Sequence, residues 1–311
     1  MGCYNCCNGP AVCRKRVCSV KGVQIMWRII LILSILLISI TVAGAANDDP
    51  FPAVASSYLL RIDGQTVWAH RPERRLAPAS LTKIMTALLV LEREPLDRVV
   101  TVSSGAAAES GTRIGLRRGN RMTVGDLLAA SLIFSANDAC RALADHVGGD
   151  RKRFITLMNA RAEKLGLKGT HFNDPCGHDQ PRHYSTAHDL AILAETALEN
   201  RTFRDLVSRQ HLQIRTADGK RRFNLRNRNQ LLGRYPGAAG VKTGFTPDAG
   251  VCLIALAERG GARVLLIMLH TRNRWHDAAA MLDRAFLRTG KVPFANSSSA
   301  ELRGIGKEEG N

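Results

Sequence analysis

The chain has 311 residues, of which 45% are hydrophobic and 23% are charged, with 27 glycines and 11 prolines. This composition is that of a globular protein with one large domain or two small ones, and it excludes a disordered chain, a collagen and a multi-span membrane protein. The formal net charge is +17; residues 1–46 hold five of the 44 basic residues and no acidic one, which leaves 39 basic against 27 acidic residues for the remainder. Aromatic residues are only 5% and the basic residues are scattered. These features disfavour a nucleic-acid partner and favour an enzyme that meets an acidic polymer or an anionic envelope.

The amino terminus has the pattern of an export signal. Residues 29–46 are uncharged and mostly aliphatic, and they end in the small residues Ala43-Gly44-Ala45. The apolar part, roughly 14 residues, is short for a bilayer span. We therefore expect residues 1–46 to be a signal peptide that exports the chain. In a bacterium, export would place the chain in the cell envelope, in the periplasm or on the extracytoplasmic face of the inner membrane. The alternative is an uncleaved N-terminal anchor, which would associate the chain with the membrane; translation could also start at Met26.

The eight cysteines fall into two groups. Five lie within residues 1–25 without a nearby histidine or zinc-finger spacing, so a metal-binding cluster is disfavoured. The other three are Cys140, Cys176 and Cys252, an odd number, of which at most one pair could form a disulfide. Their apolar and loop contexts predict that each acts as a small hydrophobic side chain.

The predicted elements begin with a β-hairpin over residues 56–70, which turns at Asp63-Gly64. A helical stretch follows. Caps and apolar spacing predict helices from Ser80 to Pro95, from Thr123 to Ile133, over 138–147, from Asp150 to Gly166 and from Thr186 to about Leu198.

The last third of the chain predicts mostly strands. A second hairpin is expected over 211–225, and extended runs over 240–246, 251–256 and 264–270 precede a closing helix over 274–287. Because no long helix separates these strands, the sheet should be antiparallel and built from both ends of the chain. The fold class is therefore α+β, a five-stranded antiparallel sheet with flanking helices and an inserted all-helical subdomain. We expect one catalytic domain over 47–290 and a disordered tail over 291–311.

Three short motifs carry the chemistry. They are Ser80-Leu81-Thr82-Lys83, Ser135-Ala136-Asn137 and Lys242-Thr243-Gly244. Residues three apart share a helix face, so the Lys83 amine can reach the Ser80 hydroxyl at a helix start, where negative charge is favoured. A lysine accepts a proton only when burial or a cationic neighbour keeps it partly neutral, and Lys242 on a facing strand would be that neighbour.

The second and third motifs suit hydrogen bonding and substrate binding. Ser135 and Asn137 fall between two predicted helices, where a loop could project into a cleft, although Ser135 also suits a plain helix cap. Lys242 and Thr243 offer a charge and a hydroxyl to a terminal carboxylate, and Gly244 lets a substrate backbone lie along the strand edge. The set predicts recognition of a peptide with a free C-terminus.

With these motifs in order, the chain resembles the low-molecular-mass penicillin-binding proteins, the serine D-alanyl-D-alanine carboxypeptidases of the peptidase S11 family. The resemblance covers about Pro52 to Leu287 and includes five blocks: Ala77–Ser80, Leu132–Ala139, Thr170–Gly177, His183–Leu190 and Gly240–Thr246. It implies the β-lactamase/transpeptidase-like DD-peptidase fold. It also implies peptidoglycan stem peptides as substrates, β-lactam antibiotics as covalent inhibitors, and no metal or organic cofactor.

The resemblance assigns roles to named residues. The catalytic set would be Ser80 as acylated nucleophile, Lys83 as general base, and Ser135 with Asn137 as the second element. The substrate-binding set would be Lys242, Thr243, Gly244, Phe245 and Arg274, with the oxyanion hole formed by the backbone N–H groups of Ser80 and Phe245. Removal of the C-terminal D-alanine through an acyl-enzyme on Ser80 is the expected reaction.

Two departures from the family pattern are Ala136, where glycine is frequent, and His178, where leucine is more common. Shorter family members include DD-endopeptidases, and only some two dozen residues follow Leu287, so cleavage of peptide cross-links is the main alternative. A class A β-lactamase is disfavoured because residues 173–184 contain no glutamate for its deacylating water. A non-catalytic peptidoglycan-binding protein is disfavoured because every motif residue is present.

Overall fold

The computed structural model describes residues 49–290. The predicted signal over 1–46, its cysteines and the predicted tail over 291–311 lie outside the described residues. Across 49–290 we find no helix with the length and apolar composition of a membrane span.

A five-stranded antiparallel sheet is the centre of the fold, as predicted. Its strands are β1 (Ala55–Ile62), β2 (Gln65–His70), β7 (Ala238–Thr246), β8 (Gly250–Arg259) and β9 (Ala262–Thr271), in the order β2-β1-β9-β8-β7. The β1–β2 turn has positive φ at both Asp63 (48°) and Gly64 (82°), the primed geometry that suits the twist of a hairpin. Pairing of β1 with β9 joins the two ends of the chain.

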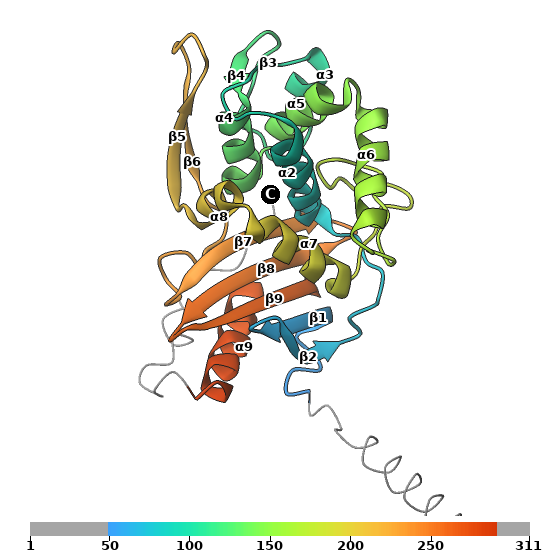
Figure 1. The fold of residues 1–311 in the computed structure, drawn as a ribbon, viewed down its shortest axis with the longest axis vertical. Helices are drawn as coiled ribbons and strands as arrows, with labels where there is room; N and C mark the ends of the chain where they lie inside the picture. Colours follow the sequence, from blue (N-terminus) through green and yellow to red (C-terminus); the bar gives the residue numbers. More distant parts are fainter. Residues whose placement is uncertain (1–48, 291–311) are drawn as a thin grey trace, which may run out of the picture. The chain divides into compact units, whose positions relative to one another are not determined.

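The sheet is buried on both faces because its strands alternate apolar residues toward two cores. Leu59 of β1 belongs to the core under the helical part, whereas its neighbour Leu60 packs with α9 (Arg274–Arg288) on the opposite face. Trp275 and Phe286 of α9 fill that second core. Figure 1 shows α9 on one side of the sheet and the helical part on the other.

The helical part is inserted between β2 and β7. It contains the 3₁₀ turn η1 (Ala79–Thr82), α2 (Lys83–Arg93), α3 (Ser104–Ala107), α4 (Val124–Ala129), the π-helical turn η2 (Ala130–Phe134), α5 (Asn137–Gly148), α6 (Arg151–Lys164), α7 (Ala187–Glu199) and α8 (Arg201–Ser208). The predicted caps are present: the side chains of Thr123, Asp150 and Thr186 each accept from a backbone N–H three residues on.

The structure adds elements that we did not predict. The inserted part is not all-helical, because β3 (Val99–Thr101) and β4 (Arg121–Thr123) form a small sheet beside the predicted hairpin of β5 (His211–Arg215) and β6 (Arg222–Arg226). Three-residue strands are too short to show alternation in the sequence. The helix predicted from Ser80 starts with the 3₁₀ turn η1, and α3 and α8 were also not anticipated.

Candidate active site

The three motifs meet at one cleft between the sheet and the helical part. Ser80 comes from η1, Ser135 and Asn137 from the junction of η2 and α5, and the third motif from the edge strand β7. The cleft has a volume of about 490 Å³. It is lined by Ser80, Gly111, Thr112, Ser135, Asn137, Cys176, Gly177, His178, Arg228, Thr243, Gly244, Phe245, Thr246, Pro247 and Arg274.

Lys83 lies beneath the cleft and is completely buried. Its Nζ atom is 2.9 Å from Ser80 Oγ, 2.7 Å from Asn137 Oδ1 and 2.6 Å from the carbonyl oxygen of Cys176. Burial lowers the pKa of Lys83 to about 7, although the carboxylates of Asp174 and Glu109 oppose this shift. The amine is therefore neutral in a large fraction of molecules near neutral pH.

The three contacts of Lys83 suit the ammonium, which donates to all three oxygens, and they also give the neutral amine a defined orientation. A neutral amine has two N–H donors and one lone pair, whereas the Asn137 and Cys176 oxygens can only accept. Both N–H groups are used by these two oxygens, so the lone pair is left for Ser80, the one neighbour that has an O–H to donate. In the neutral form, this arrangement directs the lone pair of Lys83 toward the Ser80 hydroxyl.

The backbone conformation of Ser135 and two hydrogen bonds fix the position of the second motif. Ser135 has a left-handed conformation (φ 66°) at the end of η2, and the chain turns there into α5. The hydroxyl of Ser135 accepts a hydrogen bond from Lys242 Nζ at 2.9 Å. The Asn137 amide nitrogen donates to the Ser110 carbonyl at 2.7 Å, which fixes its oxygen toward Lys83.

Lys242 is buried on β7, and its Nζ also donates to the Thr243 carbonyl at 3.0 Å. Burial holds its pKa well below the usual range, and the charges of Lys83, Arg228 and Arg274 lower the pKa further. Lys242 therefore lies near three other basic side chains. Burial, and not the charge of Lys242, is the main cause of the lowered pKa of Lys83.

Gly244 allows β7 to approach the nucleophile. A Cβ atom at this position would lie 3.1 Å from Ala79 Cβ and 3.3 Å from the Ser80 backbone nitrogen. The sequence suggested close approach of a substrate at this glycine; the structure adds a close approach by the chain itself. Arg274 Nη1 donates to the Gly244 carbonyl at 3.1 Å, and the Phe245 side chain is exposed at the cleft.

Eight of the lining residues were not among the predicted site residues, and two of these eight, His178 and Arg228, have ionisable side chains. His178 lies with Nε2 3.1 Å from the Asn137 amide nitrogen and Nδ1 3.2 Å from Asp174 Oδ1, and the hydrogen bond to Asp174 raises the pKa of His178. Its only signal in the sequence was its departure from the family pattern. Arg228 follows β6 and stacks on Phe134, and nothing in the sequence marked it.

A cluster able to bind a cation exists elsewhere. Among residues 49–290, Glu73, His188 and Asp189 bring three ligand atoms within 4.8 Å of one another. One Asp189 oxygen already accepts from the Gly169 N–H and the Thr170 hydroxyl. None of the three lines the cleft.

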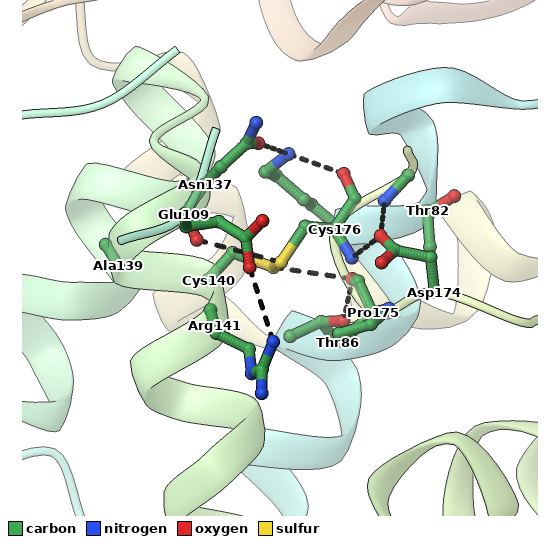
Figure 2. The surroundings of a disulfide bond; sticks show 12 residues. Thr82, Thr86, Glu109, Asn137, Ala139, Cys140, Arg141, Asp174, Pro175 and Cys176 are labelled. Atoms are coloured by element: carbon green, nitrogen blue, oxygen red, sulfur yellow. Dashed lines mark hydrogen bonds and ion pairs between the residues drawn. A yellow bond between two sulfur atoms is a disulfide. The ribbon is translucent and has the colours of Figure 1, made fainter. Parts of the chain in front are cut away.

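Two cysteines form a disulfide beside the cleft, between Cys140 of α5 and Cys176 (Figure 2). The prediction that each of the three cysteines acts as a small hydrophobic side chain is therefore wrong for this pair. They are 36 residues apart, and proximity across such a distance leaves no local pattern. Cys252 is a buried free thiol.

Comparison with known proteins agrees with this geometry. A family model described as D-alanyl-D-alanine carboxypeptidase, Peptidase S11, matches residues 46–273. D-alanyl-D-alanine carboxypeptidase DacF of Bacillus subtilis (strain 168) is 34% identical over 271 residues, which cover 82% of this chain and 69% of DacF. D-alanyl-D-alanine endopeptidase of Pseudomonas aeruginosa is 30% identical over 289 residues, 88% of this chain and 93% of that protein.

Among solved structures, the Streptomyces K15 DD-transpeptidase superposes with a TM-score of 0.67 at 35% identity, covering 70% of this chain and 90% of that chain. The predicted DD-peptidase fold is thereby confirmed. The family model and the relatives each match most of the chain. The chain belongs to the peptidase S11 family of D-alanyl-D-alanine carboxypeptidases.

Proposed function

We propose that this chain is a serine D-alanyl-D-alanine carboxypeptidase that removes the terminal D-alanine from peptidoglycan stem pentapeptides through an acyl-enzyme on Ser80. The observation that carries the proposal is the environment of Lys83. A buried amine whose two N–H groups are held by carbonyl oxygens, and whose lone pair faces a serine hydroxyl, is a general base beside its nucleophile.

The reaction proceeds in two halves. Ser80 Oγ attacks the carbonyl carbon of the penultimate D-alanine while Lys83 Nζ takes its proton. The C–N bond then breaks, and the D-alanine amine leaves with a proton. We assign its delivery to the Ser135 hydroxyl, which is held by Lys242; Ser135 gives its own proton to the amine, and the proton that Lys83 took from Ser80 replaces it. In the second half, water attacks the ester carbonyl, Lys83 accepts a water proton, and Ser80 regains its hydrogen.

The backbone supplies the oxyanion hole in this scheme. We assign it to the N–H groups of Ser80 and Phe245, because β7 runs so close to η1 that a Cβ atom at Gly244 would lie 3.3 Å from the Ser80 nitrogen. Both donors would then face the developing oxyanion from neighbouring segments.

Substrate is held at the edge of the sheet. Because β7 is an edge strand, an extended peptide can add along it. Thr243 and the cations Lys242, Arg274 and Arg228 surround the end of this strand, so the terminal carboxylate would be bound there. This arrangement selects a peptide that ends at the cleft.

The test is mass spectrometry of the products formed by the full chain from pentapeptide monomer and from cross-linked muropeptide dimer. The wild type should remove one D-alanine from the monomer, Ser80→Ala should remove none, and Ser208→Ala, at an exposed serine that ends α8, should behave as wild type. Cleavage of the dimer with an untouched monomer would contradict the proposal and make the chain an endopeptidase, as its Pseudomonas relative is named.

β-Lactam antibiotics should acylate Ser80 and be released slowly. A class A deacylating glutamate is missing from residues 173–184, and Glu109 accepts from Arg141 and does not line the cleft. Rapid repeated turnover of benzylpenicillin would show a β-lactamase instead.

The cell envelope is the proposed location, with residues 1–46 as signal or anchor and 47–290 as catalytic domain. The apolar segment supports export, and the Cys140–Cys176 disulfide supports an oxidising compartment. Sequencing the N-terminus of the protein recovered from the envelope tests this; a start at Asn47 or Ala46 indicates cleavage, and recovery from the cytoplasm would contradict export.

A further inference from the structure

The disulfide joins the two segments that hold the catalytic lysine. Cys140 lies in the first turn of α5, three residues after Asn137, and Cys176 lies in the Asp174 loop (residues 174–178). Asn137 Oδ1 and the Cys176 carbonyl are the two acceptors of Lys83 Nζ. Figure 2 shows the sulfur atoms bridging these segments next to Asn137. The disulfide therefore joins the same two segments whose oxygen atoms bind the Lys83 amine.

Hydrogen bonds within the Asp174 loop and to α2 shape the loop. Asp174 Oδ1 accepts from the backbone N–H groups of Cys176, Gly177 and His178, and the Thr86 hydroxyl donates to the Pro175 carbonyl at 2.6 Å. Toward α5, His178 Nε2 lies 3.1 Å from the Asn137 amide nitrogen, and the disulfide is the covalent link.

The loop is blocked on the side of η1. A Cβ atom at Gly177 would lie 1.9 Å from the Ala79 carbonyl oxygen, so the loop backbone already packs against the segment that carries Ser80 and cannot move toward it. Both cysteines are buried, and two reduced sulfur atoms would have to move apart, because non-bonded atoms pack at about 3.5–4.0 Å. If the loop backbone yields to this separation, the Cys176 carbonyl moves away from the Lys83 amine.

We propose that the Cys140–Cys176 disulfide is a positioning element for acylation: it holds the Cys176 carbonyl and the Asn137 amide on either side of Lys83, and full activity requires its oxidised form. The proposal rests on the proposed function, since it assumes that Lys83 activates Ser80. The proposal gives the disulfide a role in the acylation rate in addition to stabilisation of the fold.

The test measures acylation of the full chain by a fluorescent penicillin from pH 5 to pH 10, for the wild type, Cys140→Ala/Cys176→Ala and Cys140→Ser/Cys176→Ser. A displacement of about 1 Å at a catalytic group can cost about 100-fold, so we expect the double variants to acylate about 10- to 100-fold more slowly at pH 7. We also expect the midpoint of the pH profile to rise, because a displaced loop lets water reach Lys83.

Two matched controls separate positioning from stability. Cys252→Ala removes the unpaired buried thiol and should keep the wild-type rate. Phe286→Leu weakens the core on the other face of the sheet and should lower the melting temperature without changing the rate or the pH profile. Double variants that melt earlier but keep the wild-type rate and profile would overturn the proposal.

Reversible reduction covers the case in which the double variants do not fold. Dithiothreitol converts the disulfide to two thiols and becomes the cyclic disulfide, and oxidised glutathione then restores the bond with release of two glutathione thiols. Peptide mapping after alkylation identifies the state of Cys140 and Cys176. The rate should fall on reduction and return on reoxidation, whereas an unchanged rate in the mapped reduced form overturns the inference. Wild-type protein that is not acylated at all would contradict the proposed function instead.

Discussion

Lys83 shows how much of the chemistry depends on a single buried atom. An ordinary lysine is protonated at neutral pH, but burial lowers the pKa of Lys83 to about 7, so the neutral form is available near neutral pH. The two carbonyl oxygens then decide where the lone pair points. Burial makes the neutral amine available, and the two carbonyl oxygens orient it toward Ser80.

The pH dependence of acylation follows from this environment. Below pH 7 the amine holds its proton and cannot accept one from Ser80, so the acylation rate should rise from pH 5 to pH 8 with a midpoint of about 7. Lys83→Arg keeps the charge but cannot lose a proton, and should lower the rate by about 10²- to 10⁴-fold at every pH. Stopped-flow acylation measures both, with Lys168→Arg, at an exposed lysine, as the matched control. A near wild-type rate for Lys83→Arg would contradict the role of base.

At this scale the sequence predicts residues that belong to motifs and misses those that depend on distant contacts. Ser80, Lys83 and Asn137 were found because their spacing has local meaning, and the structure brings them together. His178 and Arg228 reach the cleft only through the packing of separate segments. The cysteine pair was missed for the same reason, since nothing near either residue reports on the other.

Among the elements, the Asp174 loop packs closely against the segment that carries Ser80. Gly177 has φ 92°, and its backbone lies against Ala79 so closely that any side chain would collide with the Ala79 carbonyl. Glycine is therefore required for two reasons: the positive φ disfavours other residues, and a side chain would collide with Ala79. The family block that ends at this glycine thus has a steric reason.

Gly177→Ala should disrupt the site, and Gly219→Ala provides the comparison. Gly219 also has positive φ (70°) in the β5–β6 turn, but no atom lies within 4 Å of where its Cβ would be. We expect Gly219→Ala to cost about 1–2 kcal/mol of unfolding free energy from backbone strain alone and to keep activity. Gly177→Ala should lose at least about 100-fold in acylation as well, because the loop must move away from η1. Equal effects of the two changes in urea unfolding and penicillin acylation would show that the contact with Ala79 is unimportant.

Elements with strong local signals were predicted with nearly correct bounds. The hairpins formed at Asp63-Gly64 and Asp218-Gly219, and the capped helices begin after Thr123, Asp150 and Thr186. The short strands β3 and β4 were not predicted because their pairing, across about twenty residues of chain, exists only in the folded protein. The sheet with an inserted helical part was predictable because strand patterns lie at both ends of the sequence and helix patterns lie between them.

For the whole molecule, the candidate active site lies between the edge strand β7 and the helical part. Ser80 and Lys83 start the helical part, whereas the third motif belongs to a strand added near the end of the chain. The site therefore forms only after β1 pairs with β9 and β7 is in place. Catalytic competence and complete folding should coincide.

The segment that contains the β5–β6 hairpin has a local excess of basic side chains. Residues 209–228, which include the β5–β6 hairpin, carry seven basic side chains and one acidic one. Arg215 lies directly opposite Arg222 across the two strands, and Arg226 is exposed on the same hairpin. Like charges in register oppose strand pairing, so this arrangement costs stability. A basic hairpin attracts an acidic polymer such as the cell wall.

Neutralising the basic side chains of the hairpin should weaken binding to peptidoglycan without changing acylation by penicillin. Arg215→Gln/Arg222→Gln/Arg226→Gln should acylate with penicillin as wild type and melt no earlier, because a like-charge pair is removed. Its binding to isolated peptidoglycan sacculi at 50 mM salt should fall about tenfold or more, to the level that the wild type shows at high salt, where these attractions are screened. The control Arg234→Gln/Arg284→Gln/Arg288→Gln removes the same charge from exposed positions outside the hairpin and should bind as wild type. Equal losses in the two triple variants would mean that net charge, and not the hairpin, brings the enzyme to the wall.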